Sequence, residues 1–141
     1  MIDIIGTLRQ IFRRVNQIFD LVNAIFTLTE TGGTLITAVA PGADIERDIY
    51  INDAPMGVYE PVAVKIDLSN LIAAEIVVIR TYYRYNIGGG FILEDINTYT
   101  GVQVVPSKSI NLVPNRFGIQ VTLERTAGAQ RNHDWYVVIR V

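Results

Sequence analysis

The residues of this chain that could do chemistry are few and scattered. The single histidine, His133, is followed by Asp134, but neighbouring side chains on a strand point to opposite faces. A catalytic histidine needs a nucleophile and an orienting acid arranged around it. We therefore expect His133 on the surface or at the edge of the core, and the sequence predicts no enzyme activity and no catalytic residues.

Two further motifs could suggest ion binding. Asp44, Glu46 and Asp48 alternate, so their carboxylates could share one strand face and hold calcium, but no loop of EF-hand spacing accompanies them. Charged side chains also commonly protect exposed strand edges from aggregation. The glycines at positions 88–90 lack the following helix and the Lys-Ser or Lys-Thr pair of a phosphate loop, so they predict a hairpin turn. We expect no metal site and no cofactor.

Aromatic side chains offer a third kind of site. Tyr83, Tyr85 and Tyr99 could stack on sugars or form a surface between subunits, because tyrosine combines an apolar ring with a polar tip. The alternative is that they are ordinary core or interface aromatics. These three tyrosines are the candidate ligand surface, and a glycan is the candidate ligand.

Composition points to burial between subunits. Half of the 141 residues are hydrophobic and 18% are charged, against about 25% charged in typical domains. No apolar run approaches the roughly 18 residues that a membrane-spanning helix needs. An obligate subunit interface would absorb the apolar excess. The net charge of −2 and the scattered arginines give no reason to expect nucleic acid as a partner.

The elements that must position these residues begin with a helix. Apolar residues near the N-terminus recur with alternating gaps of four and three, which is the period of a coiled coil. We call this set the heptad stripe: Ile4, Leu8, Ile11, Val15, Ile18, Val22 and Ile25. Every d position of the repeat is isoleucine. Because β-branched residues at d shift preference from dimers toward trimers and tetramers, we expect a homotrimer, with a tetramer as the second choice.

A second apolar row widens the same face. It comprises Ile5, Phe12, Phe19 and Phe26 at the e positions, and Leu21 and Leu28 add to it at g. Neighbouring helices or another partner would have to cover this row, which we assign to stalk packing or docking. Two alternatives stay open: the helix packs on its own domain, or it lies on a membrane surface. The strict heptad period favours self-assembly over both.

The period changes to two after Gly32-Gly33, which we take as the domain boundary. Residues 1–31 are expected to form the oligomerisation helix and residues 32–141 the second domain. Alternating runs separated by turn residues predict about eight strands there, the first beginning at Thr34 and a short one at 102–105. The fold class is therefore mainly β: an antiparallel, jelly-roll-like β-sandwich preceded by one long coiled-coil helix.

The end of the chain carries a resemblance. The stretch 118–135 contains Val121-Thr122-Leu123 and Thr126-Ala127-Gly128, then a basic residue and an aromatic strand. It resembles the closing hairpin of small β-sandwich virion proteins of tailed viruses from thermophilic bacteria and archaea. The upstream run from 82–85 to 99–101 is similar to the preceding hairpin of that group, so the likeness covers roughly the C-terminal half.

The resemblance implies a structural protein of the virion, such as a head decoration, head fibre or tail appendage, and it transfers no catalytic residues. We expect a non-enzymatic virion protein that trimerises through its helix and contacts capsid or tail proteins. A trimeric glycan-binding module is the second hypothesis, and a protein whose helix binds a membrane surface is the third.

Overall fold

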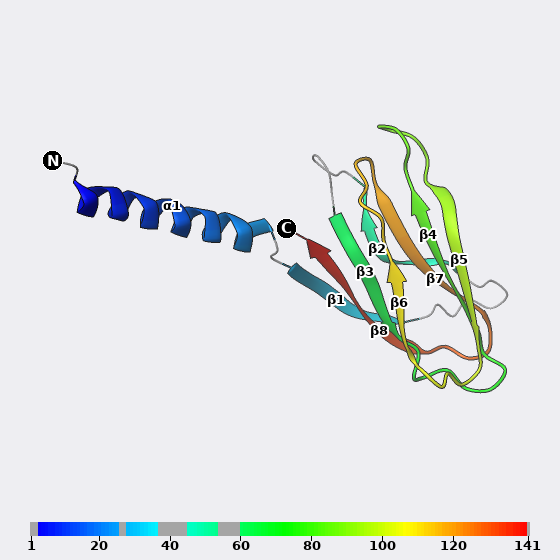
Figure 1. Cartoon of the computed structure of the whole chain (residues 1–141). Helices are drawn as coiled ribbons and strands as arrows, with labels where there is room; N and C mark the ends of the chain where they lie inside the picture. Colours follow the sequence, from blue (N-terminus) through cyan, green and yellow to red (C-terminus); the bar gives the residue numbers. More distant parts are fainter. Residues whose placement is uncertain (1–2, 26–27, 37–44, 54–59, 141) are drawn as a thin grey trace.

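The structure is a computed structural model that describes residues 3–25, 28–36, 45–53 and 60–140, without the side chains of 19–25, 28, 29, 36 and 60. One helix precedes eight strands (Figure 1). In chain order these are α1 (Ile4–Ile25), β1 (Leu28–Ile36), β2 (Arg47–Asn52), β3 (Glu60–Asp67), β4 (Ile76–Tyr83), β5 (Ile92–Thr100), β6 (Ser107–Asn111), β7 (Ile119–Ala127) and β8 (Asn132–Arg140).

The strands form two four-stranded antiparallel sheets with a regular pairing rule. The sheets run in the order β1-β8-β3-β6 and β2-β7-β4-β5. The first strand pairs with the eighth, the second with the seventh, the third with the sixth and the fourth with the fifth. This is the topology of a long hairpin wrapped into two Greek keys, which defines a jelly roll. The predicted fold class, a jelly-roll-like sandwich after one helix, is confirmed.

The core lies between the two sheets and follows the alternation along each strand. On β4, Val77, Ile79 and Tyr83 face inward, while Arg80 and Tyr82 lie on the outer face. The buried hydrophobic cluster comprises Ile49, Val64, Ile66, Leu68, Leu71, Val77, Ile79, Tyr83, Ile110, Leu112, Ile119, Val121, Leu123 and Val137. Both sheets contribute to it, so the apolar face of each sheet is buried against the other.

The boundary between helix and sandwich differs from the expected one. The helix ends at Ile25, and Gly32-Gly33 lie inside β1, not at a joint before it. Leu28, expected at a helical g position, is the first residue of β1 and pairs with Arg140. The polar sequence of β1 resembles a linker, but its backbone completes the ladder along β8, and that pairing overrides its weak strand propensity.

A second difference concerns the stretch 102–105, which was expected to be a short strand. These residues form the connection between β5 and β6, and the side chain of Val104 is 99% exposed. The ladder begins instead at Ser107, which pairs with Asp67 of β3. Apolar residues alone therefore misled the prediction, because strand formation here depends on a partner strand.

Antiparallel pairing gives the sandwich two distinct ends (Figure 1). We call the end where β1 begins and β8 finishes the helix end, because α1 extends away from it. We call the opposite end, with the connections β3–β4, β5–β6 and β7–β8, the far end. The two ends carry different surfaces, described below.

The two glycines of β1 provide a matched test of the β1–β8 pairing. A Cβ added to Gly32 would lie 2.4 Å from the Trp135 carbonyl oxygen and 2.7 Å from the Tyr136 Cβ, whereas one on Gly33 would lie 3.8 Å from the Trp135 ring. Because backbone must move to admit the first methyl group, Gly32→Ala should lower the free energy of unfolding by about 1–3 kcal/mol. Gly33→Ala should be neutral or slightly stabilising. Urea unfolding of both variants checks this, and equal effects would contradict the register.

Candidate functional site

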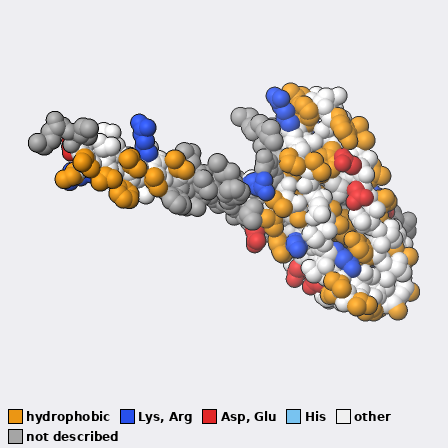
Figure 2. All heavy atoms as spheres, viewed as in Figure 1, with side chains coloured by type: hydrophobic (Ala, Val, Ile, Leu, Met, Phe, Trp, Pro, Cys, Tyr) orange, Lys and Arg blue, Asp and Glu red, His pale blue; other side chains and the backbone are white. Residues whose placement is uncertain are grey.

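The most prominent surface feature of the described residues is the apolar face of α1. Figure 2 shows hydrophobic side chains gathered along the N-terminal part of this helix, whose side chains are described up to Ile18. The described members of the heptad stripe and of the e-position row are exposed to between 39% and 66%. They are Ile4, Ile5, Leu8, Ile11, Phe12, Val15 and Ile18. The side chains of Phe19, Val22 and Ile25, and the whole of Phe26, lie outside the described residues.

Local interactions start the helix but do not account for its stability. Asp3 is the N-cap: its Oδ1 accepts a hydrogen bond from the Gly6 N–H at 2.9 Å, and its carbonyl accepts one from the Thr7 N–H at 3.1 Å. The sequence signal for this cap, an aspartate directly before the apolar repeat, was available and was overlooked. A cap contributes about 1 kcal/mol, whereas helices owe most of their stability to packing of an apolar face. Exposed apolar surface costs roughly 25 cal/mol per Å², and α1 exposes a continuous apolar stripe.

The three tyrosines of the expected ligand surface are not brought together. Tyr83 is 4% exposed, and its hydroxyl accepts a hydrogen bond from the Val113 N–H at 2.8 Å. Tyr99 is partly buried and packs against the core beneath the ammonium group of Lys108. Tyr85 is 62% exposed and donates a hydrogen bond to Glu94. Strand β4 ends at Tyr83, so the alternation that would place Tyr85 on the same face does not continue.

A buried carboxylate that the sequence analysis missed organises the far end of the sandwich. Glu75 is 3% exposed and accepts hydrogen bonds from the Ile72 N–H at 2.9 Å, the Ala129 N–H at 3.2 Å and the Arg131 Nε at 2.9 Å. Its own carbonyl accepts a fourth from the Gly101 N–H at 2.8 Å. One residue thus ties together the connections β3–β4, β5–β6 and β7–β8.

The neighbouring glycine and the electrostatics fit this role. A Cβ on Gly128, whose φ is +96°, would lie 2.3 Å from the Glu75 Cγ, so a side chain there would displace the carboxylate. Burial alone would raise the pKa of Glu75, but the bonds from Ile72, Arg131 and Ala129 outweigh it and lower the pKa. The carboxylate is therefore charged at neutral pH and has a structural function.

The single histidine is also structural. His133 is 1% exposed, not at the surface, and its Nδ1 lies 3.1 Å from the Asp67 carbonyl oxygen. Burial lowers the pKa of His133, so the neutral ring is favoured. Its proton is on Nδ1, because the Asp67 carbonyl oxygen can only accept a hydrogen bond. Asp134, next in sequence, instead accepts a hydrogen bond from the Thr34 hydroxyl at 2.5 Å.

Two of the three acidic residues considered for calcium, Glu46 and Asp48, are engaged by side chains of neighbouring strands. Glu46 accepts hydrogen bonds from the hydroxyls of Tyr82 and Thr122 and lies 3.4 Å from Arg80, which also pairs with Glu124. Burial and the bond to Glu46 raise the pKa of Tyr82 to about 12. Asp48 accepts a hydrogen bond from Gln120, and Asp44 is outside the described residues. Within the described part of the chain, no group of three or more His, Cys, Asp or Glu could hold a metal ion.

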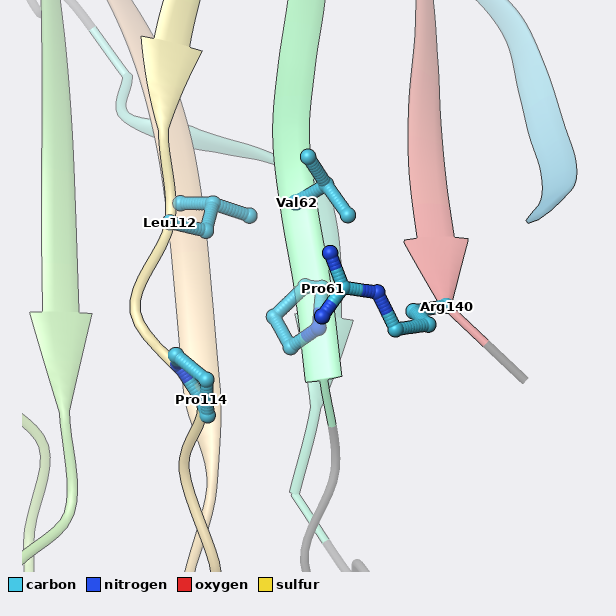
Figure 3. Close-up of a pocket in the computed structure, with 5 residues that line it drawn as sticks. All are labelled: Pro61, Val62, Leu112, Pro114 and Arg140. Atoms are coloured by element: carbon cyan, nitrogen blue, oxygen red, sulfur yellow. The ribbon is translucent and has the colours of Figure 1, made fainter. Parts of the chain in front are cut away.

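A shallow depression lies at the helix end of the sheet β1-β8-β3-β6 (Figure 3). Its volume is about 220 Å³, and it is lined by Pro61, Val62, Leu112, Pro114 and Arg140. Pockets for small ligands usually measure about 300–1,000 Å³ and enclose most of the ligand. This depression is smaller than such a pocket, and four of its five lining residues are aliphatic or proline. In the described residues, no helix is long and apolar enough to cross a membrane.

The buried carboxylate yields a prediction about stability and pH. Glu75→Gln should lower the free energy of unfolding by about 2–3 kcal/mol at pH 7, because it removes charged hydrogen bonds to a buried group. Since the folded pKa is lowered, this stability is present above the ordinary glutamate pKa of 4.5 and is lost as the pH falls through the folded value. The variant should therefore lose less stability on acidification than the parent.

Urea unfolding at pH 7 and at several pH values below 4.5 measures both effects. The matched control is Glu94→Gln, which alters an exposed carboxylate and should change stability by less than about 0.5 kcal/mol. An unchanged stability of Glu75→Gln at pH 7 would contradict the structural role assigned to this residue.

Comparisons with known proteins add little to this picture. No protein-family model matches the chain, and no curated protein matches it in sequence. Among solved structures, the chain is similar to one titled "Structure of infectious bursal disease virus Gt strain", with a TM-score of 0.41 and 12% sequence identity. The match covers 81% of this chain and 33% of that one, so the chain spans about a third of the length of that protein.

Proposed function

We propose that this chain is a non-enzymatic structural protein of a virus particle that assembles into a homotrimer through α1 and presents its jelly roll as a head. The observation that carries the proposal is the exposed heptad stripe on a helix that extends away from the sandwich (Figure 1). A stripe with this period matches the facing holes of identical helices. Self-association covers it without any contribution from the head.

The number of chains follows from the residue types in the stripe. Ile4, Ile11 and Ile18 occupy d positions and are all exposed, and Leu8 and Val15 occupy a positions. β-Branched residues at d favour three or four strands over two. The e-position residues Ile5 and Phe12 widen the apolar face beyond what a dimer can cover, which supports a thicker bundle. A trimer is our choice and a tetramer the alternative.

The head supports a role in a particle. Jelly rolls built from two Greek keys are typical of viral capsid and lectin domains. The closing hairpin β7–β8 is the part of the sequence that resembles virion proteins, and the ion pair between Glu75 and Arg131 lies beside its turn. The described polar clusters are engaged in holding strands and loops together. The function would then be mechanical: the helices gather three heads and anchor them to capsid or tail proteins.

Charge substitutions in the heptad stripe test the assembly directly. Full-length protein should have a mass in solution of three times the 15.7 kDa chain, and the double variant Ile11→Asp, Ile18→Asp should be monomeric. Buried unpaired carboxylates cost several kcal/mol each in such a core. The control is Asn16→Asp with Gln17→Asp on the polar face, which should leave the mass unchanged. Size exclusion with light scattering gives the masses.

A monomeric full-length protein would refute the proposal. Co-sedimentation with liposomes would then decide whether the helix binds a membrane surface instead. If the helix is to be removed, the truncated chain must begin at Leu28, because a start at Thr34 would delete most of β1.

Residue shape at the d positions gives a second test. Replacing the isoleucines at positions 4, 11, 18 and 25 by leucine conserves volume and keeps valine at two a positions. Leucine at d with β-branched a residues favours parallel dimers, so the mass should shift from three chains toward two. Analytical ultracentrifugation over a range of concentrations measures the shift. A variant that remains wholly trimeric would show that the e-position row, and not the d isoleucines, sets the number of chains.

A further inference from the structure

The connector between helix and head is short, so it would keep the heads of a parallel assembly close together. Only two residues lie between Ile25 at the end of α1 and Leu28 at the start of β1. Three residue steps span at most about 11 Å when fully extended. Helices in a bundle lie about 8–10 Å apart. In an assembly of parallel helices, the first residues of neighbouring β1 strands are therefore held within about 30 Å of one another.

The cross-section of the head is of the same order as that distance. Its two sheets are about 10 Å apart, and four strands at about 4.8 Å spacing make each sheet nearly 15 Å wide before side chains are added. Two heads of this size on tethers no more than about 30 Å apart are held beside one another. Surfaces close to Leu28 are the best placed to touch, because that residue is tethered to the helix.

Strand β1 is the element nearest to that tether, and it has an open side. It lies at the edge of its sheet, with β8 as its hydrogen-bonded neighbour among the described strands. The residues from Glu30 to Thr34 are all exposed. An edge strand exposes unpaired N–H and C=O groups that can bind another chain. The glycines at 32 and 33 add no side chains that would keep another backbone away.

Apolar surface continues beneath this strand. The ring of Trp135 lies against Gly33, where a Cβ would be 3.8 Å from it, and both Trp135 and Ile139 are only partly buried on the inner face of β8. Tyr136, on the outer face, is 41% exposed and pairs with Gly32. Aromatic side chains of this kind are enriched in protein interfaces.

We propose that the open side of β1, residues 30–34 with the aromatic side chains of β8 beside it, is the surface through which the heads of one assembly contact each other. The partner is a second copy of this chain. This inference rests on the proposed function, because the helix must first gather the copies in parallel. It adds a second interface: the heads form a closed collar and do not move independently on the stalk.

Because the chain has no cysteine, single introduced thiols can test the contact. Thr31→Cys and Glu30→Cys place an exposed thiol on β1, and Val104→Cys places one at the far end as the control. The variants are treated with a short bis-maleimide at micromolar protein concentration. The cross-linked fraction at position 31 or 30 should exceed that at position 104 by at least roughly ten-fold, since tethered thiols have effective concentrations near millimolar.

Three results are distinguishable when the mass of each variant is measured alongside. A trimer or tetramer that cross-links at β1 and not at position 104 supports the collar. An assembly that cross-links no more at β1 than at position 104 overturns the collar and leaves the proposed function standing. A monomeric protein overturns both. Two positions on β1 are used so that the test still stands if one of the two variants fails to fold. Circular dichroism checks that each variant retains its structure.

Discussion

The far end of the molecule depends on one buried charge. Glu75 accepts hydrogen bonds from three residues on two connections, and its carbonyl holds a third. A carboxylate so deeply buried would be costly if any of these partners were missing, because desolvation must be offset by hydrogen bonds and charge. The connections must therefore adopt one mutual arrangement, and the strands that they join are fixed in register with them. These bonds hold together the connections that join the paired strands of the jelly roll at its far end.

Much of this fold could be predicted from periodicity. The heptad spacing predicted a helix near the N-terminus, and alternating runs separated by turn residues predicted about eight strands, because burial on one face imposes the period of each element. The boundaries were harder. Strand β1 contains Thr-Glu-Thr-Gly-Gly, which has little strand propensity of its own and depends on the backbone of β8. The valines at 102, 104 and 105 look like a strand but are exposed in a connection.

The candidate site could be predicted only where it is local. The heptad stripe is visible because its residues are three and four positions apart on one helix. The bond between Arg131 and Glu75 joins residues 56 positions apart, so no short-range pattern reveals it. The same limit explains Tyr83: its neighbours in sequence suggest an aromatic surface, but pairing with β5 and β7 places it in the core. Long-range pairing decides which polar and aromatic residues are buried.

The central place of β8 in its sheet has a consequence for the order of events during synthesis. It lies between β1 and β3, so these strands have no direct contact until β8, made after the other seven, is available. Pairings between distant segments form slowly, whereas a helix of 22 residues forms from contacts between near neighbours. The helix emerges from the ribosome long before its own head can fold. If α1 assembles as proposed, nascent chains on one messenger RNA would meet through their helices first, and their heads would fold side by side.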